Sequence, residues 1–388
     1  MGSILNFVFP HNISDVPNWI KPGPLTSKII SNYSHTYNFE LKENCENILI
    51  CESANEFKGF INNFHTSINT QSLSEFIFNN KNIKIILSSL ADPCTDVEKK
   101  DIIEFVKQNQ IESRVFYIES NFANAKYKNT FCWHSFIDDY VNHLNIMFEV
   151  KAKNELGYTS EKIQLSELDN FRNKKFLSFN RAIDRKHRIT FLYDYLRNDF
   201  SDSYFSFLSY FENYKSIYYD NWEEIDYTYF NKILPIELDT HLVESKNNFD
   251  TGITLGKKEF YLNSCINIVT ETSFNENELF ISEKIIKPIL HFQPFIVMSS
   301  VNYLSELRNI GFKTFSDFWD ESYDNIEDPT ERYQTILKLI LELNSKSIEE
   351  LNELYQQTKN ICIHNNNLLY SIKSNFDDII NAINDIKI

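Results

Sequence analysis

Glycine is scarce in this sequence, which holds only seven among 388 residues. None of the seven has the spacing G-x-G-x-x-G or G-x-x-x-x-G-K-[ST], so neither a dinucleotide-binding fingerprint nor a Walker loop is present. The hydrolase patterns G-x-S-x-G and H-E-x-x-H are missing as well. No D-x-D occurs, which removes the usual metal-binding signature of metal-dependent sugar transfer. We therefore expect neither a metal nor a bound cofactor.

Basic residues are in deficit. Lysine and arginine number 38 against 54 aspartates and glutamates, which gives a net charge of −16. A nucleic-acid-binding protein normally carries a basic surplus that replaces the counterions along the phosphates, so we expect no nucleic-acid partner. An anionic membrane surface is disfavoured for the same reason.

Long apolar runs and paired cysteines are lacking too. The six cysteines form no C-x-x-C pair, which argues against a zinc site and against a disulfide framework. No apolar run approaches the roughly 20 residues of a membrane span, and the first residues lack the pattern of a signal peptide. The expectation is a soluble, cytoplasmic protein without a membrane span.

Short apolar runs that alternate with helical patterns dominate the first half of the chain. The pattern predicts strands over residues 47–53, 82–90 and 113–120, and helices over 95–109 and 131–148. Apolar strands separated by helices are typical of parallel α/β layers, in which both faces of the sheet are covered.

A polar segment, residues 151–173, breaks this alternation, and the pattern then restarts. It predicts strands over 174–180, 204–211, 266–272, 294–300 and 312–315, and helices over 184–198, 302–311, 329–343, 347–362 and 368–388. We predict an α/β protein with two Rossmann-like domains facing a cleft, and C-terminal helices that pack back across the domains. The expected parts are an acceptor-side domain (1–165), a nucleotide-sugar-binding domain (166–365) and a C-terminal helix (366–388).

The main basic cluster is "NRAIDRKHR", residues 180–188, directly after a predicted strand. Arg185 and Arg188 would lie one turn apart on a helix, with Arg181 in the loop before it. Cations are unfavourable at a helix N-terminus, so three arginines there favour an anionic ligand. The alternative is that they pair with local carboxylates such as Asp184 and Asp194.

A second cluster, Ser282-Glu283-Lys284, stands at the start of another predicted helix. Ser282 is a plausible N-cap, and Pro288 either interrupts this helix or begins a second one. Backbone N–H groups and the Lys284 ammonium could hold a diphosphate here, and Glu283 could accept hydrogen bonds from ribose hydroxyls. The alternative is an ordinary solvated helix start.

The order strand, acidic loop, S-E-K, proline and "QPFIV" strand resembles the nucleotide-binding half of GT-B glycosyltransferases. The likeness is to fucosyltransferase-like and exostosin-like families, and to uncharacterised glycosyltransferase-like proteins of phages, large viruses and bacteria. It covers Lys174 to Arg332. Phe280-Ile281-Ser282 replaces the Tyr-Val-Thr that usually precedes Glu-Lys in fucosyltransferases, so the resemblance does not assign the donor sugar.

This resemblance implies a hexosyl- or deoxyhexosyltransferase that moves a sugar from a nucleotide-sugar donor to a glycan, lipid or protein acceptor. Glu283 would contact the ribose, and Lys284 would neutralise the diphosphate together with Arg181, Arg185 or Arg188. For Lys284 and Arg188 we expect direct diphosphate contacts and little effect of their substitution on folding, because neither belongs to the apolar pattern.

An inverting transfer also needs a general base. The ends of the predicted N-terminal strands offer Asp92 and Glu119 as catalytic candidates, and both could equally be loop or cap residues. The competing class is a non-catalytic sugar- or phosphate-binding protein, or a structural viral protein.

Overall fold

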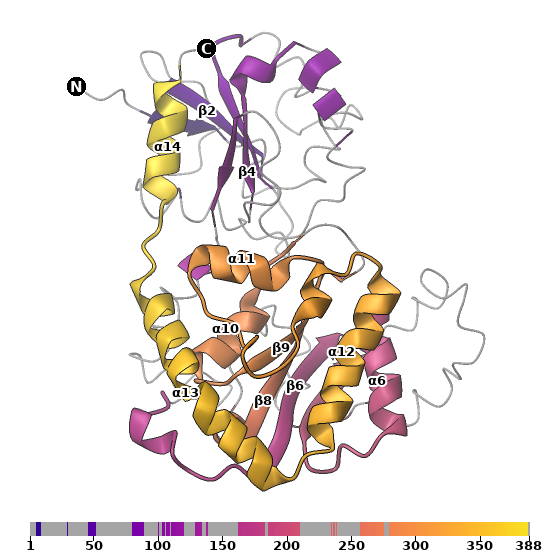
Figure 1. Cartoon of the computed structure of the whole chain (residues 1–388). Helices are drawn as coiled ribbons and strands as arrows, with labels where there is room; N and C mark the ends of the chain where they lie inside the picture. The colour runs from indigo at the N-terminus through magenta and orange to yellow at the C-terminus, as the bar shows by residue number, and fades with distance from the viewer. Residues whose placement is uncertain are drawn as a thin grey trace. The chain divides into compact units, whose positions relative to one another are not determined.

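The structure is a computed structural model, shown in Figure 1, and the chain forms two compact units. The first unit comprises residues 1–139, 276–280 and 373–388, and the second comprises 140–275 and 281–372. The residues that the structure describes are 5–8, 29, 46–51, 80–88, 100, 103–104, 106–108, 110–119, 129–133, 137–138, 162–182, 185–209, 234, 236, 238, 257–274 and 279–386.

The described strands of the first unit form one parallel sheet in the order β1-β2-β3-β4-β5. These strands are β1 (Leu5–Val8), β2 (Glu46–Cys51), β3 (Lys84–Ser88), β4 (Val115–Glu119) and β5 (Thr130–Cys132). Every residue of β3 is buried, as expected of a strand covered on both faces. The predictions of β2, β3 and β4 are confirmed.

The helix predicted over residues 131–148 is wrong at its start. Phe131 and Cys132 belong to β5, where Phe131 pairs with Ile118 of β4. The backbone N–H of Trp133 continues this pairing by donating to the carbonyl of Glu119 at 2.9 Å. An aromatic, apolar run is compatible with a strand as well as with the buried face of a helix. Here the run begins as a strand because it pairs with β4 at the edge of the sheet.

The C-terminal helix α14 (Phe376–Asp385) completes the core of the first unit (Figure 1). Its apolar face contributes Phe376, Ile379, Ile380 and Ile383 to the same cluster as Ile48, Ile50, Ile86 and Phe116 of the sheet. The next residues along each strand, including Leu49, Ile85 and Val115, form a second cluster with Val106 and Ile111. The two clusters lie on opposite faces of the sheet, because successive side chains along a strand point to opposite faces.

The described strands of the second unit form a parallel sheet in the order β7-β6-β8-β9. They are β6 (Lys174–Ala182), β7 (Tyr204–Ser209), β8 (Ser264–Thr270) and β9 (Phe295–Met298). The chain passes from β6 to β7 on one side and from β8 to β9 on the other, so the order reverses between β6 and β8. Such a reversal is a topological switch point, beyond whose carboxyl ends open α/β sheets bind ligands.

Helices join and cover this second sheet, largely where the sequence predicts them. They are α6 (Lys186–Arg197), α9 (Lys258–Asn263), α10 (Glu283–Leu290), α11 (Tyr303–Ile310), α12 (Pro329–Asn344) and α13 (Ile348–Ser371), with 3-10 turns η4 (Leu165–Glu167) and η7 (Ser322–Asn325). In the first unit, η2 (Glu112–Arg114) precedes β4. Across the described residues, no helix is long and apolar enough to cross a membrane.

The N-terminus of α10 is as predicted, because the Ser282 hydroxyl accepts the backbone N–H of Lys284 at 3.3 Å. Pro288 lies inside α10 rather than beginning a new helix. A proline donates no backbone hydrogen bond, and α10 ends soon after it, at Leu290. Gly311 ends α11 in the left-handed region, at a φ of 110°, which favours glycine.

The polar segment before β6 is not an exposed linker in its described part. Arg172 is fully buried, its guanidinium lies 3.6 Å from the centre of the Tyr355 ring, and it donates to the carbonyl of Ser264 at 2.8 Å. The predicted boundary between residues 165 and 166 therefore falls in a stretch that packs on the second unit. The contacts of buried Arg172 with α13 depend on the fold, so the polar composition of the segment could not predict them.

Two further expectations near the C-terminus differ from the structure. Residues 312–315 form no strand, because the side chain of Asn365 pairs with both the N–H and the carbonyl of Lys313, each at 2.8 Å. Residue 366 does not open a separate helix, since α13 runs on to Ser371 and α14 begins at Phe376.

Candidate functional site

The candidate site lies at the carboxyl ends of β6 and β8, at the switch point of the second sheet. Helix α6 begins after β6, and α10 begins after β8, so two helix N-termini follow the two strands. The backbone N–H groups and the dipole of a helix N-terminus favour a bound anion.

Beneath this edge, a chain of buried polar side chains joins β6 to β8. The Ser178 hydroxyl donates to the carbonyl of Ile268 at 2.8 Å, and the amide of Asn180 donates to Ser178 at 3.1 Å. Thr270 in turn donates to the side-chain carbonyl of Asn180 at 2.6 Å. Because these buried polar side chains hydrogen-bond to one another or to the backbone, their burial leaves no free-energy penalty from unsatisfied groups, and the network holds the ends of β6 and β8 rigidly together.

Glu271, the residue after β8, is fully buried and connects the surrounding elements. Its carboxylate accepts the hydroxyl of Ser282 at 2.5 Å and the phenol of Tyr303 at 2.7 Å. Burial raises the pKa of this carboxyl, and the charge of Lys284 opposes that shift in part. Glu271 therefore fixes the start of α10 and the start of α11 against the end of β8.

On the α6 side, Arg188 and His187 bind the backbone at the end of β8. Arg188 is 6% exposed, and its Nη2 donates to the carbonyls of Thr270 and Glu271 at 3.1 and 3.0 Å. His187 donates from Nε2 to the same Glu271 carbonyl at 2.9 Å and stacks on Phe274. Burial holds the pKa of His187 well below its usual value, so the ring is neutral with its proton on Nε2.

On the α10 side, Glu283 and Lys284 pair with each other. The Lys284 Nζ donates to Glu283 Oε1 at 2.8 Å, to Ser282 Oγ at 3.2 Å and to Thr272 Oγ1 at 3.3 Å. The two charged side chains are 23% and 18% exposed. Burial acts to raise the pKa of Glu283, but the charges of Lys284 and Lys287 outweigh it, and the pKa is lowered.

Most of the predicted donor-binding residues lie at the starts of α6 and α10. Ser282 is the N-cap of α10, and Glu283 and Lys284 are in its first turn. Arg185 is the half-buried N-cap of α6, and Arg188 follows in its first turn. The backbone of Arg181 belongs to β6, while its side chain lies outside the described residues.

The two catalytic candidates belong to the first half of the chain. Asp92 lies outside the described residues. Glu119 ends β4 in the first unit and is buried. The assignment of either as a base stays a prediction. Among the residues that the structure describes, no three His, Cys, Asp or Glu side chains are grouped as a metal site.

Sequence reasoning missed Glu271, Thr272 and Tyr303. The available signal was position: Glu271 and Thr272 close the predicted strand 266–272, and side chains at the carboxyl end of a parallel strand face the ligand crevice. Tyr303 carried no such signal, because a tyrosine in the first turn of an amphipathic helix normally packs in a core.

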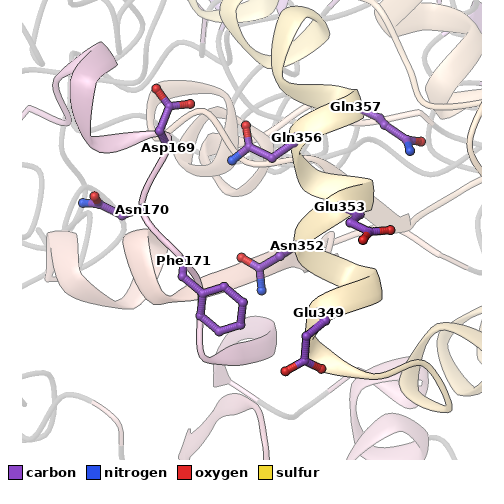
Figure 2. A pocket seen from close by; sticks show the side chains of 8 residues that line it. All are labelled: Asp169, Asn170, Phe171, Glu349, Asn352, Glu353, Gln356 and Gln357. Carbon is purple, nitrogen blue, oxygen red and sulfur yellow. The ribbon is translucent and has the colours of Figure 1, made fainter.

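A groove of about 580 Å³ lies elsewhere on the second unit, between residues 169–171 and α13 (Figure 2). Its lining residues are Asp169, Asn170, Phe171, Glu349, Asn352, Glu353, Gln356 and Gln357. Asn352 pairs with both backbone groups of Arg172 at 2.8 Å, just before β6 begins. The groove is therefore near the amino end of β6, away from the polar cluster at the carboxyl end.

Comparison with known proteins gives little further evidence. No protein-family model matches the chain, and no curated protein matches it. A solved structure described as "Crystal Structure of alpha1,3-Fucosyltransferase" is similar at 12% identity and a TM-score of 0.40, over 100% of this chain and 91% of that one.

Proposed function

We propose that the second unit binds the nucleoside diphosphate of a sugar nucleotide and that the chain is a glycosyltransferase. The observation that carries the proposal is the switch point between β6 and β8, where the first turn of α10 presents Glu283 and Lys284. A sheet edge of this kind is the usual ligand position in open α/β folds.

The anionic part of the ligand fits the N-terminus of α10. Lys284 is partly exposed there, and Arg185 stands at the N-terminus of α6. The first turn of α6 contains no acidic residue, whereas in the first turn of α10 Glu283 pairs with Lys284. Cations at such positions are stabilised when an anion joins them.

The polar part of the ligand fits Glu283, whose carboxylate can accept hydrogen bonds from vicinal hydroxyls of a ribose. This role, like the assignment to sugar transfer rather than another nucleotide chemistry, is supported by the resemblance of the S-E-K segment and its flanking strands to GT-B glycosyltransferases. The donor is a sugar nucleotide, and the acceptor is a glycan, a lipid or a protein.

The proposed transfer is metal-independent. The nucleoside diphosphate leaves as an anion, so the transition state needs positive charge near the departing phosphate. Lys284, Arg185 and the N-terminus of α10 would supply it. An inverting transfer also needs a general base, for which Asp92 and Glu119 are the predicted candidates.

Binding is tested by calorimetric titration of the full chain with a panel of nucleoside diphosphates. Lys284→Ala should weaken the best ligand by roughly 10- to 150-fold, the value of one charge-assisted hydrogen bond of about 1.5–3 kcal/mol. The matched control is Lys338→Ala, which removes a lysine from an exposed ion pair with Glu342 on α12. Absence of binding to every nucleoside diphosphate would contradict the proposal.

Transfer is tested separately from binding. The chain is incubated with a panel of sugar nucleotides and glycan acceptors, and products are identified by mass spectrometry. Product that forms with the parent and falls with Lys284→Ala supports a transferase. Tight binding of a nucleotide with no transfer to any acceptor would instead favour a sugar- or phosphate-binding protein.

A further inference from the structure

The groove beside α13 carries an exposed aromatic ring that sugar transfer at the other end of the sheet does not use. Phe171 lines the groove with a side chain that is 60% exposed, and in Figure 2 its ring points from residues 169–171 toward α13. A single exposed ring on a protein surface needs no explanation, but a ring that lines a groove offers an apolar surface to a ligand. The groove volume of about 580 Å³ lies in the range of small-molecule sites.

Hydrogen bonds between α13 and the segment before β6 fix the shape of this groove. Asn352 pairs with both backbone groups of Arg172 at 2.8 Å, and the side-chain amide of Gln356 donates to the carbonyl of Leu168 at 3.2 Å. Both walls are therefore held in place before a ligand arrives. Binding to such a groove does not have to overcome the entropy cost of ordering it.

Apart from the Phe171 ring, the side chains that line the groove are amides and carboxylates, and none of them is cationic. Four are amides, which both donate and accept hydrogen bonds, and three are carboxylates, which only accept them. Asp169 forms an ion pair with Lys359, whereas Glu349 and Glu353 form no ion pair with any residue that the structure describes. The lining therefore suits hydroxyl groups and repels anions.

A neutral sugar has the chemistry that matches this lining. One face of a sugar ring exposes C–H groups that can pack on an aromatic side chain, and its rim carries hydroxyls that both donate and accept hydrogen bonds. An acidic sugar would instead meet Glu349 and Glu353 with no lining cation to balance its charge. A basic peptide could pair with those carboxylates, but the four amides carry no charge that would attract it.

We propose that this groove binds a neutral oligosaccharide, with one sugar ring stacked on Phe171 and its hydroxyls bonded to the surrounding amides and carboxylates. The groove lies near the amino end of β6, whereas the proposed transfer site lies at the carboxyl end, so this is a second carbohydrate site on the same unit. Binding there requires no nucleotide. The inference goes beyond the proposed function and does not depend on it.

The test measures oligosaccharide binding by the full chain without nucleotide. An array of neutral, sialylated and uronate-containing oligosaccharides identifies the strongest neutral probe, and calorimetric titration then gives its affinity. Phe171→Ala removes the ring and Phe171→Tyr keeps it. The matched control is Leu165→Ala, because Leu165 is also an exposed large hydrophobic residue, at 56%, but does not line the groove. Melting temperatures confirm that the variants are folded.

Phe171→Ala should weaken binding of the neutral oligosaccharide by roughly 2- to 12-fold, the value of one aromatic contact. Phe171→Tyr should retain binding, and Leu165→Ala should match the parent. Acidic oligosaccharides should bind the parent more weakly than neutral ones. Replacing Glu349 and Glu353 together by glutamine should narrow that difference by roughly two- to fivefold for each carboxylate, since the repelling charges are gone.

Three results would overturn the inference. The folded parent retains no neutral oligosaccharide, or it binds one with an affinity that Phe171→Ala leaves unchanged, which would place the sugar elsewhere on the chain. In the third, an oligolysine peptide binds more tightly than any oligosaccharide and is lost when Glu349 and Glu353 are replaced, which would show a groove for basic peptides. None of these results affects the proposed function, which is tested by nucleotide binding and Lys284→Ala.

Discussion

The hydroxyl of Ser282 donates to the buried carboxylate of Glu271 at 2.5 Å while it accepts the backbone N–H of Lys284 at 3.3 Å. One side chain thus serves as the cap of α10 and as the tie between α10 and the end of β8. A serine can cap a helix without a carboxylate partner, so the bond from Ser282 to Glu271 is an additional interaction that belongs to this site.

Substitution of Ser282 should therefore cost more than the loss of a cap. Ser282→Ala should lower the free energy of unfolding by about 2–3 kcal/mol, since it removes the cap and leaves Glu271 with one donor fewer. The control is Ser347→Ala, which removes the exposed cap of α13 and should cost about 1 kcal/mol. Equal costs in denaturant titrations would show that the bond to Glu271 contributes nothing to stability.

The buried carboxyl of Glu271 should also make stability depend on pH. Its folded-state pKa lies above the ordinary value of 4.5, so the folded protein holds this proton more tightly than the unfolded chain. The stability from this group is complete below pH 4.5 and is lost as pH rises through the folded-state pKa. Glu271→Gln cannot titrate, so the parent should gain stability relative to the variant as pH falls from neutral towards 4.5.

This prediction is measured by denaturant unfolding of both proteins at a series of pH values. The difference between the two proteins removes the effects of other carboxyl groups, which are common to both. A difference that stays constant with pH would mean that Glu271 has the same pKa in the folded and unfolded states.

Arg188 should affect folding, against the expectation from the sequence. Its guanidinium is buried and donates to the carbonyls of Thr270 and Glu271, so Arg188→Ala should cost about 2–4 kcal/mol from lost charge-assisted bonds and a cavity. Arg185→Ala, at a half-buried N-cap without a side-chain cap bond, should cost much less. Similar unfolding midpoints for the parent and Arg188→Ala would contradict the structural role.

The strands and most of the helices could be predicted from the sequence because their signal is local. The apolar run 82–90 is recognised as a strand from adjacent residues alone. The same holds for Ser282 as the cap of a helix. The strand predicted over 312–315 failed because its backbone partner, Asn365, lies far away in α13. Asp324 is likewise buried and accepts the N–H groups of Leu304 and Ser305 at the start of α11, a contact between residues about 20 positions apart that no local pattern contains.

The candidate site divides in the same way. Ser282, Glu283 and Lys284 stand out because they begin a helix after a strand, and this needs no knowledge of the fold. That the end of β8 and the start of α6 meet there depends on the strand order, which no local pattern contains. The hydrogen bonds of Arg188 to backbone carbonyls follow from that order, so the sequence could not predict this structural contact, and the diphosphate contact of Arg188 stays a prediction.

Helix α14 supplies part of the first unit's core. Phe376 is fully buried with its ring centre 4.8 Å from that of Trp133, and the Asn375 amide donates to the carbonyl of Cys132 at 3.1 Å. Phe376→Ala should therefore cost about 3–5 kcal/mol, as for a large buried aromatic. The control is Phe171→Ala in the second unit, where the ring is 60% exposed and the cost should stay within about 0.5 kcal/mol.

Calorimetry of the full chain should show the lower melting temperature of Phe376→Ala in the transition of the first unit, if the two units unfold separately. A nucleoside diphosphate bound to the second unit should leave that lowered transition in place, since a ligand stabilises only the unit whose unfolding releases it. Equal melting behaviour of Phe376→Ala and Phe171→Ala would show that α14 is dispensable for the core. Recovery of the lowered transition by the nucleotide would show instead that the two units unfold together.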